Sequence, residues 1–258
     1  MSNRRSKPPS RLVVGIHPVL ELLRAGQSVN RIRVATTREA TPAFDDLVRL
    51  ADERRVPVEF VDRRDLEHAA AGLTHQGVVA DAPPFAMAPF EAVVERVTGQ
   101  PAALLVAIDG VTDPHNIGSI ARTAEAVGAV AMLIPQRRSG GITPVVEKAA
   151  AGALAHLAVA HVPNLVRALS LLREVGVWSL GLDADADHEV AEHPLATEPC
   201  VVVVGAEGDG LSRLTRERCD ALVRLDMSGQ VASLNASVAA GIALYRLGQI
   251  RRRVSRDS

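Results

Sequence analysis

The second half of the chain alternates short, uninterrupted apolar runs with longer segments of helical periodicity. The strand-like runs are 104–108, 130–134, 177–182 and 200–204, and helical segments lie at 117–127 and 165–175. An apolar run without polar alternation is typical of a strand that helices cover on both faces of a parallel sheet. We therefore predict a doubly wound α/β domain over residues 102–250.

Residues 12–82 have the pattern of a smaller α/β unit. We expect helices at 18–24 and 44–54 and strands at 31–35, 58–61 and 77–80. Pro83, Pro84 and Pro89 interrupt this pattern, so residues 83–101 are predicted to form a linker. The basic ends are predicted to be tails, 1–11 as a disordered one and 251–258 as a short one.

Composition narrows the classes of protein that the chain can belong to. The formal net charge of −1 gives no overall attraction to nucleic acid, and an aromatic content of 2% argues against a surface that stacks bases. No apolar run approaches the roughly 18 to 20 residues of a membrane span, and the N-terminus lacks the apolar stretch of a signal peptide. We therefore expect a cytoplasmic protein without a membrane segment, in which Cys200 and Cys219 are reduced core residues.

Three polar clusters each follow a predicted strand, where ligands bind in open α/β sheets. In the first, Asn116 opens a helix whose outward side carries Arg122 and Glu125, three residues apart. We expect Glu125 to hold Arg122 near the sheet edge, unless the two form only a solvated ion pair.

The second cluster, Gly205-Ala-Glu-Gly-Asp-Gly-Leu211, has glycines that let the backbone approach a ligand closely. A dinucleotide loop competes with this interpretation, but the glycine spacing is not G-x-G-x-x-G. In the third cluster, residues 225–237, Ser233 is predicted to cap the final helix, whereas Asn235 and Ser237 have no such structural explanation.

Metal chemistry finds no support in the residues. The run Asp183-Ala-Asp-Ala-Asp187 imitates a calcium loop, but the sixth position is His188 instead of glycine and the twelfth is Pro194 instead of glutamate. We therefore expect a solvated loop there. The eight histidines show no metal-ligand spacing, and no serine lies in a G-x-S-x-G elbow.

In this order, the three clusters resemble the signature motifs of the SpoU/TrmH family of RNA 2′-O-methyltransferases, in the SPOUT superfamily. The first motif matches at Asn116, Gly118, Arg122 and Gly128, the second at Gly205 to Leu211, and the third at Ser233-Leu-Asn-Ala-Ser-Val-Ala239. Residues 12–82, with Gly15-Ile-His-Pro-Val19 and His75-Gln-Gly77, are similar to the L30e-like RNA substrate-binding domain of the branch that methylates 23S rRNA.

The resemblance implies a deep trefoil knot in the C-terminal SPOUT domain, S-adenosyl-L-methionine as cofactor, no metal, and a homodimer. The matching cofactor-binding positions are Gly205, Leu225, Leu234, Met227, Glu207 and Ser233, and the matching catalytic positions are Arg122, Asn116, Glu207, Ser233 and Asn235. A guanidinium with a pKa above about 12 has almost nothing to accept a proton with at neutral pH. We therefore interpret Arg122 as an electrostatic partner that orients the ribose or phosphate and stabilises a developing alkoxide.

The implied reaction is methyl transfer to a ribose 2′-hydroxyl, with a guanosine of 23S rRNA as the first choice of target. The alternatives are an antibiotic-resistance rRNA or tRNA 2′-O-methyltransferase, and an inactive RNA-binding ribosome-assembly factor. A nicotinamide-dependent oxidoreductase is a third reading, because Asp226 lies about twenty residues after the glycine loop.

Overall fold

The computed structural model describes residues 10–137, 139–229 and 233–257. The chain divides after Ala86 into two compact units, which are treated separately below. The tail expected at 1–11 lies outside the described residues except for its last two, and Arg11 begins a strand.

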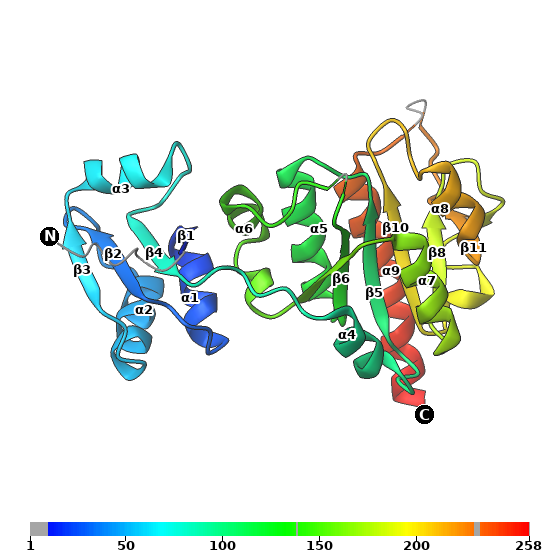
Figure 1. Ribbon diagram of the computed structural model, residues 1–258, viewed down its shortest axis with the longest axis horizontal. Coiled ribbons are helices and arrows are strands. Elements are labelled where there is room, and N and C mark those ends of the chain that lie inside the picture. Colours follow the sequence, from blue (N-terminus) through cyan, green and yellow to red (C-terminus); the bar gives the residue numbers. More distant parts are fainter. Residues whose placement is uncertain (1–9, 138, 230–232, 258) are drawn as a thin grey trace, which may run out of the picture. The chain divides into compact units, whose positions relative to one another are not determined.

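The first unit is a four-stranded sheet with helices (Figure 1). Its strands, in the spatial order β1-β4-β2-β3, are β1 (Arg11–Val14), β4 (Val78–Ala82), β2 (Arg31–Ala35) and β3 (Val58–Val61). Its helices are α1 (Ile16–Arg24), α2 (Pro42–Glu53) and α3 (Arg63–Ala70). The expected helices and strands are all present to within a few residues, whereas β1 and α3 were not predicted. Leu66 and Ala70 of α3 pack on Val14, Ala35 and Val79 of the sheet.

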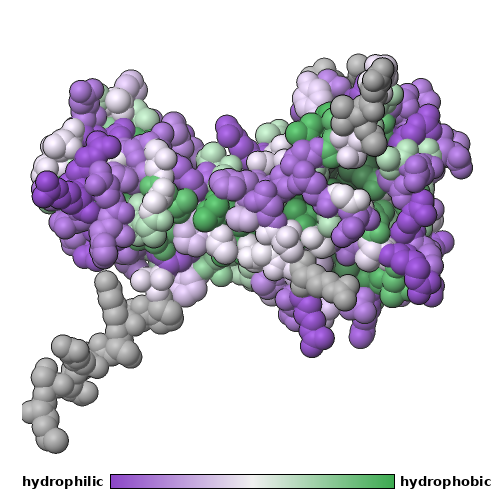
Figure 2. Space-filling model, turned by 90° about the horizontal axis from the view of Figure 1, so that it is seen from above, coloured by the Kyte–Doolittle hydropathy of each residue, from purple (hydrophilic) through white to green (hydrophobic). Residues whose placement is uncertain are grey.

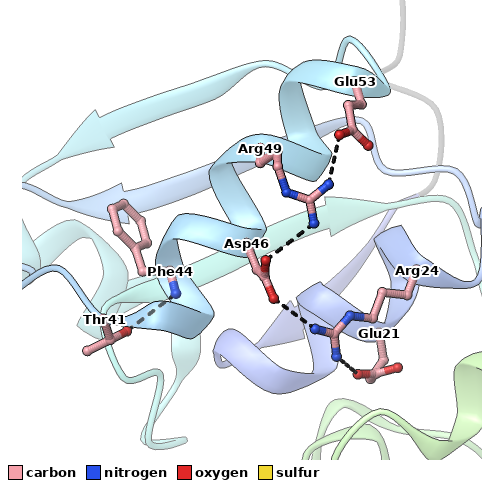
Figure 3. A network of polar contacts seen from close by, with 7 residues as sticks. All are labelled: Glu21, Arg24, Thr41, Phe44, Asp46, Arg49 and Glu53. Carbon is pink, nitrogen blue, oxygen red and sulfur yellow. Dashed lines mark hydrogen bonds and ion pairs between the residues drawn. The ribbon is translucent and has the colours of Figure 1, made fainter.

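Two local features hold α1 and α2 in place. Thr41 caps α2, because its hydroxyl accepts a hydrogen bond from the Phe44 amide at 3.3 Å. Asp46 of α2 accepts hydrogen bonds from Arg24 of α1 at 3.1 Å and from Arg49 of its own helix at 3.3 Å (Figure 3). These ion pairs are exposed, so each contributes little to the stability of the unit.

The second unit is a seven-stranded sheet whose ladders are all parallel. Its spatial order is β7-β6-β5-β10-β8-β11-β9, and its strands are β5 (Leu104–Asp109), β6 (Ala131–Pro135), β7 (Ala158–Val162), β8 (Trp178–Leu182), β9 (His188–Glu189), β10 (Cys200–Gly205) and β11 (Ala221–Arg224). The helices are α4 (Phe90–Val97), α5 (Pro114–Ala126), α6 (Pro144–Ala150), α7 (Leu165–Glu174), α8 (Arg213–Arg218) and α9 (Ala236–Asp257), with short 3-10 turns at Ala153–Ala155 and Pro194–Ala196.

Helices cover this sheet on both faces, as the continuous apolar runs predict. Residues of α4 and α7 share one core cluster with the inward side chains of β5, β6, β7 and β10. On the other face α9 packs beside α5 and along β10 (Figure 1). Arg251 of α9 donates a hydrogen bond to Cys200 of β10. No helix in the part of the chain that the structure describes is long and apolar enough to cross a membrane.

Two boundary predictions are wrong. The expected linker 83–101 contains α4, because Pro89 starts a helix whose Val93 and Val97 are buried in the core of the second unit. The expected tail from residue 251 is the end of α9, and Arg251 is 5% exposed because its guanidinium donates to the Glu198 carbonyl at 2.5 Å and to Cys200 Sγ at 3.0 Å. Helix α6 ends within the alanine-rich stretch 149–155, because Ala151 and Gly152 adopt positive φ.

Candidate functional site

The glycine loop after β10 folds back onto its own strand. Ala206 and Gly210 exchange two backbone hydrogen bonds of 2.9 Å each, and Gly208 and Gly210 have φ of 86° and 67°. A Cβ on Gly205 would lie 2.1 Å from the Gly210 carbonyl carbon, so only glycine permits this turn. The loop therefore projects Glu207 beyond the carboxyl end of the sheet.

Helix α5 brings Asn116 to the same edge. Asp113 caps the helix by accepting from the His115 amide at 2.9 Å, and Pro114 occupies its first turn. Asn116 is therefore not needed as a cap, so its side chain is free to reach the glycine loop. The residue is buried, with 5% of its surface exposed. Two residues later, Gly118 allows α6 to pack closely against the backbone of α5, because a Cβ at this position would lie 2.6 Å from the Val146 carbonyl oxygen.

The cap of α9 is Asn235, which corrects the prediction for Ser233. The helix begins at Ala236, and Asn235 Oδ1 accepts from the amides of Ser237 at 2.9 Å and Val238 at 3.3 Å. Ser233 lies two residues too early to cap this helix, and it is exposed. The Ser237 hydroxyl also donates to Asn235 Oδ1, at 2.7 Å, which explains its place in the cluster.

One residue from each of the three polar clusters takes part in a shared set of side-chain hydrogen bonds. Asn116 Nδ2 donates to Glu207 Oε2 at 3.3 Å, and Asn235 Nδ2 donates to Asn116 Oδ1 at 3.0 Å and to Glu207 Oε2 at 3.4 Å. Asn116 and Asn235 are 119 residues apart in the chain. The fold thus joins the three clusters into a single carboxylate held by two amides, which we call the Asn-Glu-Asn cluster.

A cavity of about 430 Å³ lies beside this cluster, within the size range of small-molecule sites. It is lined by the glycine loop and by parts of the segments that follow β8 and β11 and precede α9. Seen from the carboxyl ends of the strands, the second unit shows hydrophobic surface in a hollow bordered by hydrophilic side chains (Figure 2). All six positions named for the cofactor line it: Gly205, Glu207, Leu225, Met227, Ser233 and Leu234.

The segment after β8 also belongs to the cavity, contrary to the expectation of a solvated loop. Asp183 and Asp185 line it, and the Asp183 carboxylate accepts from Arg216 Nε and from the Asp185 amide. Burial by itself raises the pKa of Asp183, but the hydrogen bonds from Arg216 and from the Asp185 amide outweigh burial and lower that pKa below its ordinary value. The position of this loop directly after a buried parallel strand was the signal for it.

Arg122 stands apart from the cavity. It is exposed, and it makes no ion pair or hydrogen bond with any residue that the structure describes, so the expected contact with Glu125 is not formed. Arg122 follows Asn116 by six positions on α5, which corresponds to about 9 Å along the helix axis. Within the described ranges no group of three His, Cys, Asp or Glu side chains converges to hold a metal ion.

Comparison with known proteins agrees with this arrangement. Residues 103–245 match the SpoU rRNA Methylase family, and residues 12–88 match the RNA 2′-O ribose methyltransferase substrate-binding family. The chain is 43% identical over 242 residues to an uncharacterized tRNA/rRNA methyltransferase of Mycolicibacterium vanbaalenii, covering 93% of this chain and 77% of that protein. It is also 43% identical over 237 residues to the 23S rRNA (guanosine-2′-O-)-methyltransferase RlmB of Pseudomonas syringae pv. tomato, covering 90% and 93%.

Among solved structures, the chain resembles the SpoU methyltransferase AviRb from Streptomyces viridochromogenes in complex with AdoMet. The TM-score is 0.75 and the identity 26%, and the match covers 95% of this chain and 91% of that one.

Proposed function

The chain belongs to the SpoU rRNA methylase family, and we propose that it transfers a methyl group from S-adenosyl-L-methionine to a ribose 2′-hydroxyl of RNA, at a guanosine of 23S rRNA. The observation that carries the proposal is the Asn-Glu-Asn cluster at the edge of the cavity, which unites all three family motifs. The choice of 23S rRNA is supported by the RlmB relative and by the substrate-binding domain at residues 12–88.

The cavity residues fit this cofactor. It carries positive charge, an adenine ring and several hydrogen-bonding groups, and the cavity offers the carboxylates of Asp185 and Asp209 together with apolar side chains and the bare backbone at Gly205. Gly205, Leu225, Met227, Ser233 and Leu234 would hold it. When bound, the cofactor supplies an electrophilic methyl carbon on a positively charged sulfur.

The residues of the chain position the reactants. Asn116 and Asn235 fix the direction of the Glu207 carboxylate, and the apolar walls at Leu182, Leu211 and Val223 keep part of the cavity dry. Arg122 projects into solvent from α5, where its guanidinium is available to a ribose or phosphate of the RNA and to the charge that develops on the 2′-oxygen. Arg122→Ala is therefore expected to abolish turnover while leaving cofactor affinity unchanged.

A homodimer is part of the proposal. Val238, Ile242 and Tyr245 follow one another at helical spacing on α9 and are 48%, 41% and 52% exposed. An apolar stripe of this kind suits a second copy of the same helix, and family membership supports that occupant. Sedimentation equilibrium of the full chain is expected to give twice the mass of one chain. The Ile242→Asp variant is expected to give the mass of a single chain.

The deep trefoil knot stays a proposal as well. The chain returns from β11, at the far side of β8, to α9 beside β10 and β5, and Asn235 reaches the glycine loop on the way. An experimental structure that traces residues 225–235 tests whether this segment passes through a loop of the chain. We also propose a cytoplasmic location, since that is where ribosomal RNA of bacteria is found.

The deciding experiment supplies tritiated S-adenosylmethionine and total RNA from a strain that lacks the gene, and separates rRNA from tRNA before counting. Label in 23S rRNA, recovered after alkaline hydrolysis in a 2′-O-methylated dinucleotide, is the expected result. Label in tRNA instead would show that the substrate is tRNA. If the protein binds the cofactor but labels neither free RNA nor ribosomal particles, the alternative of an inactive RNA-binding factor is favoured.

A further inference from the structure

The Glu207 carboxylate is bonded on one oxygen only. Both amides of the Asn-Glu-Asn cluster donate to Oε2, from Asn116 at 3.3 Å and from Asn235 at 3.4 Å. Oε1 takes no hydrogen bond from any residue that the structure describes. Two donors on a single oxygen leave the other oxygen with its lone pairs available, in a residue that lines the cavity.

The direction of both amides is fixed by the fold. Asn235 Oδ1 is occupied by the amides of Ser237 and Val238 at the start of α9, so its Nδ2 must point toward Asn116 and Glu207. Asn116 Oδ1 in turn accepts from Asn235, which leaves its own Nδ2 for Glu207. A cluster that holds one carboxylate oxygen and offers the other is preorganised for proton transfer.

The remaining ionisable groups of the cavity are less suited to this task. Asp183 is paired with Arg216, and Arg224 donates to Asp226 at 3.1 Å and to the Ala186 carbonyl at 2.9 Å. The carboxylates of Asp185 and Asp209 line the cavity, but no described side chain orients either of them. Arg122 lies outside the cavity, and a guanidinium does not accept protons at neutral pH.

We propose that Glu207 Oε1 is the proton acceptor for the ribose 2′-hydroxyl, an inference that rests on the proposed function. As the bond between the 2′-oxygen and the methyl carbon forms, the carbon–sulfur bond breaks and its electron pair goes to sulfur, which becomes a neutral thioether. The proton of the hydroxyl passes to Oε1, and the protonated carboxyl then loses it to water. Charge and atoms balance without any further reactant.

The test compares Glu207→Gln with wild type in two measurements on the full chain. Glutamine keeps the shape but has no carboxylate, so single-turnover methylation of 23S rRNA is expected to fall by about 10²- to 10⁴-fold. S-adenosylmethionine affinity, measured by calorimetry without RNA, is expected to change by less than about tenfold. Glu217→Gln removes a carboxylate of α8 that is paired with Arg213 outside the cavity, and it is the control expected to leave both quantities unchanged.

The pH dependence separates proton transfer from a purely structural role. Wild-type turnover is expected to rise with pH to a plateau, whereas in Glu207→Gln the rate keeps rising, because hydroxide must take the proton. Asn235→Asp keeps the helix cap but places a second carboxylate against Glu207, so the rising limb is expected to move to higher pH.

Each outcome has a definite meaning. A Glu207→Gln rate within tenfold of wild type, or a rate with the wild-type plateau at a uniformly lower level, overturns the proposal. Loss of cofactor binding in the same variant overturns it as well, because Glu207 would then hold the cofactor. If the wild-type protein methylates no RNA, the proposed function is refuted instead. This result is obtained before any variant is made.

Discussion

Replacing Gly118 by alanine is expected to destabilise the second unit, although alanine is the better helix former. A Cβ at this position would lie 2.5 Å from Ala149 Cβ, 2.6 Å from the Val146 carbonyl oxygen and 2.9 Å from the Ala150 amide nitrogen. Carbon atoms in contact prefer about 3.5 to 4.0 Å, so α5 and α6 must separate by about 1 Å. Two of the three obstacles are backbone atoms, which cannot rotate away.

The magnitude follows from two opposing contributions. Overpacking of a core costs about 1 to 3 kcal/mol, and the higher helix propensity of alanine returns about 0.5 to 1 kcal/mol. Because the neighbours are rigid, we expect a cost in the upper part of the first range. The free energy of unfolding should therefore fall by about 2 kcal/mol, which corresponds to a thermal midpoint lower by about 4 to 8 °C for a unit of this size.

The assay is urea unfolding of the full chain followed by the fluorescence of Trp178, the single tryptophan, which lies in β8 and reports on the second unit alone. Gly241→Ala in α9 is the matched control, because its Cβ would meet Thr123 only at 3.7 and 3.8 Å. The same substitution is therefore expected to stabilise there by about 0.5 to 1 kcal/mol. Equal stability of the Gly118 variant and wild type, or equal destabilisation at both positions, would refute the reasoning.

Three further changes test other parts of the structure. Because the pKa of Asp183 is lowered in the folded state, its stabilising effect is fully present above the ordinary carboxyl pKa of about 3.9 and is lost as pH falls through the folded value. Asp183→Asn should therefore lower the urea midpoint at pH 7, and the difference from wild type should shrink steadily as pH falls below about 3.9. Burial, with Asp220 and Asp109, raises the pKa of Cys219 to about 12, so iodoacetamide at pH 8 should label this thiol in urea and spare it in the native protein, as counted by mass spectrometry. Arg251→Ala leaves the Glu198 carbonyl without its charged donor and should cost about 1.5 to 3 kcal/mol in the same urea assay, and a loss below about 0.5 kcal/mol would contradict a stabilising role.

The sequence predicted the sheets better than the segments that join them. Buried parallel strands such as β5 and β10 are nearly pure apolar runs, so periodicity alone identifies them. Helix α4 was hidden because three prolines precede it, and Pro89, directly before its first residue, was interpreted as an interruption of the pattern. Arg251 was assigned to a tail from its charge, since nothing local reveals that a distant carbonyl will accept its proton.

The sequence identified which residues belong to the candidate site, but not which of them contact one another. The motifs identified Asn116, Glu207 and Asn235, yet their mutual hydrogen bonds depend on three strand ends that only the folded sheet brings together. Ser233 and Asn235 are both good capping residues, and the choice between them is made by where α9 packs against α5. Glu125 has suitable spacing for Arg122, but spacing permits an ion pair without enforcing it.

The separation of Asn116 from Asn235 has a consequence for the time course of biosynthesis. At about 5 to 20 residues per second, the 119 residues between them take about 6 to 24 s to be polymerised. During that interval the ribosome has produced the first amide of the cluster and then the carboxylate, but not the residue that locks both. A nascent chain can thus order its N-terminal unit early, whereas the Asn-Glu-Asn cluster forms only after Asn235 has emerged from the ribosome.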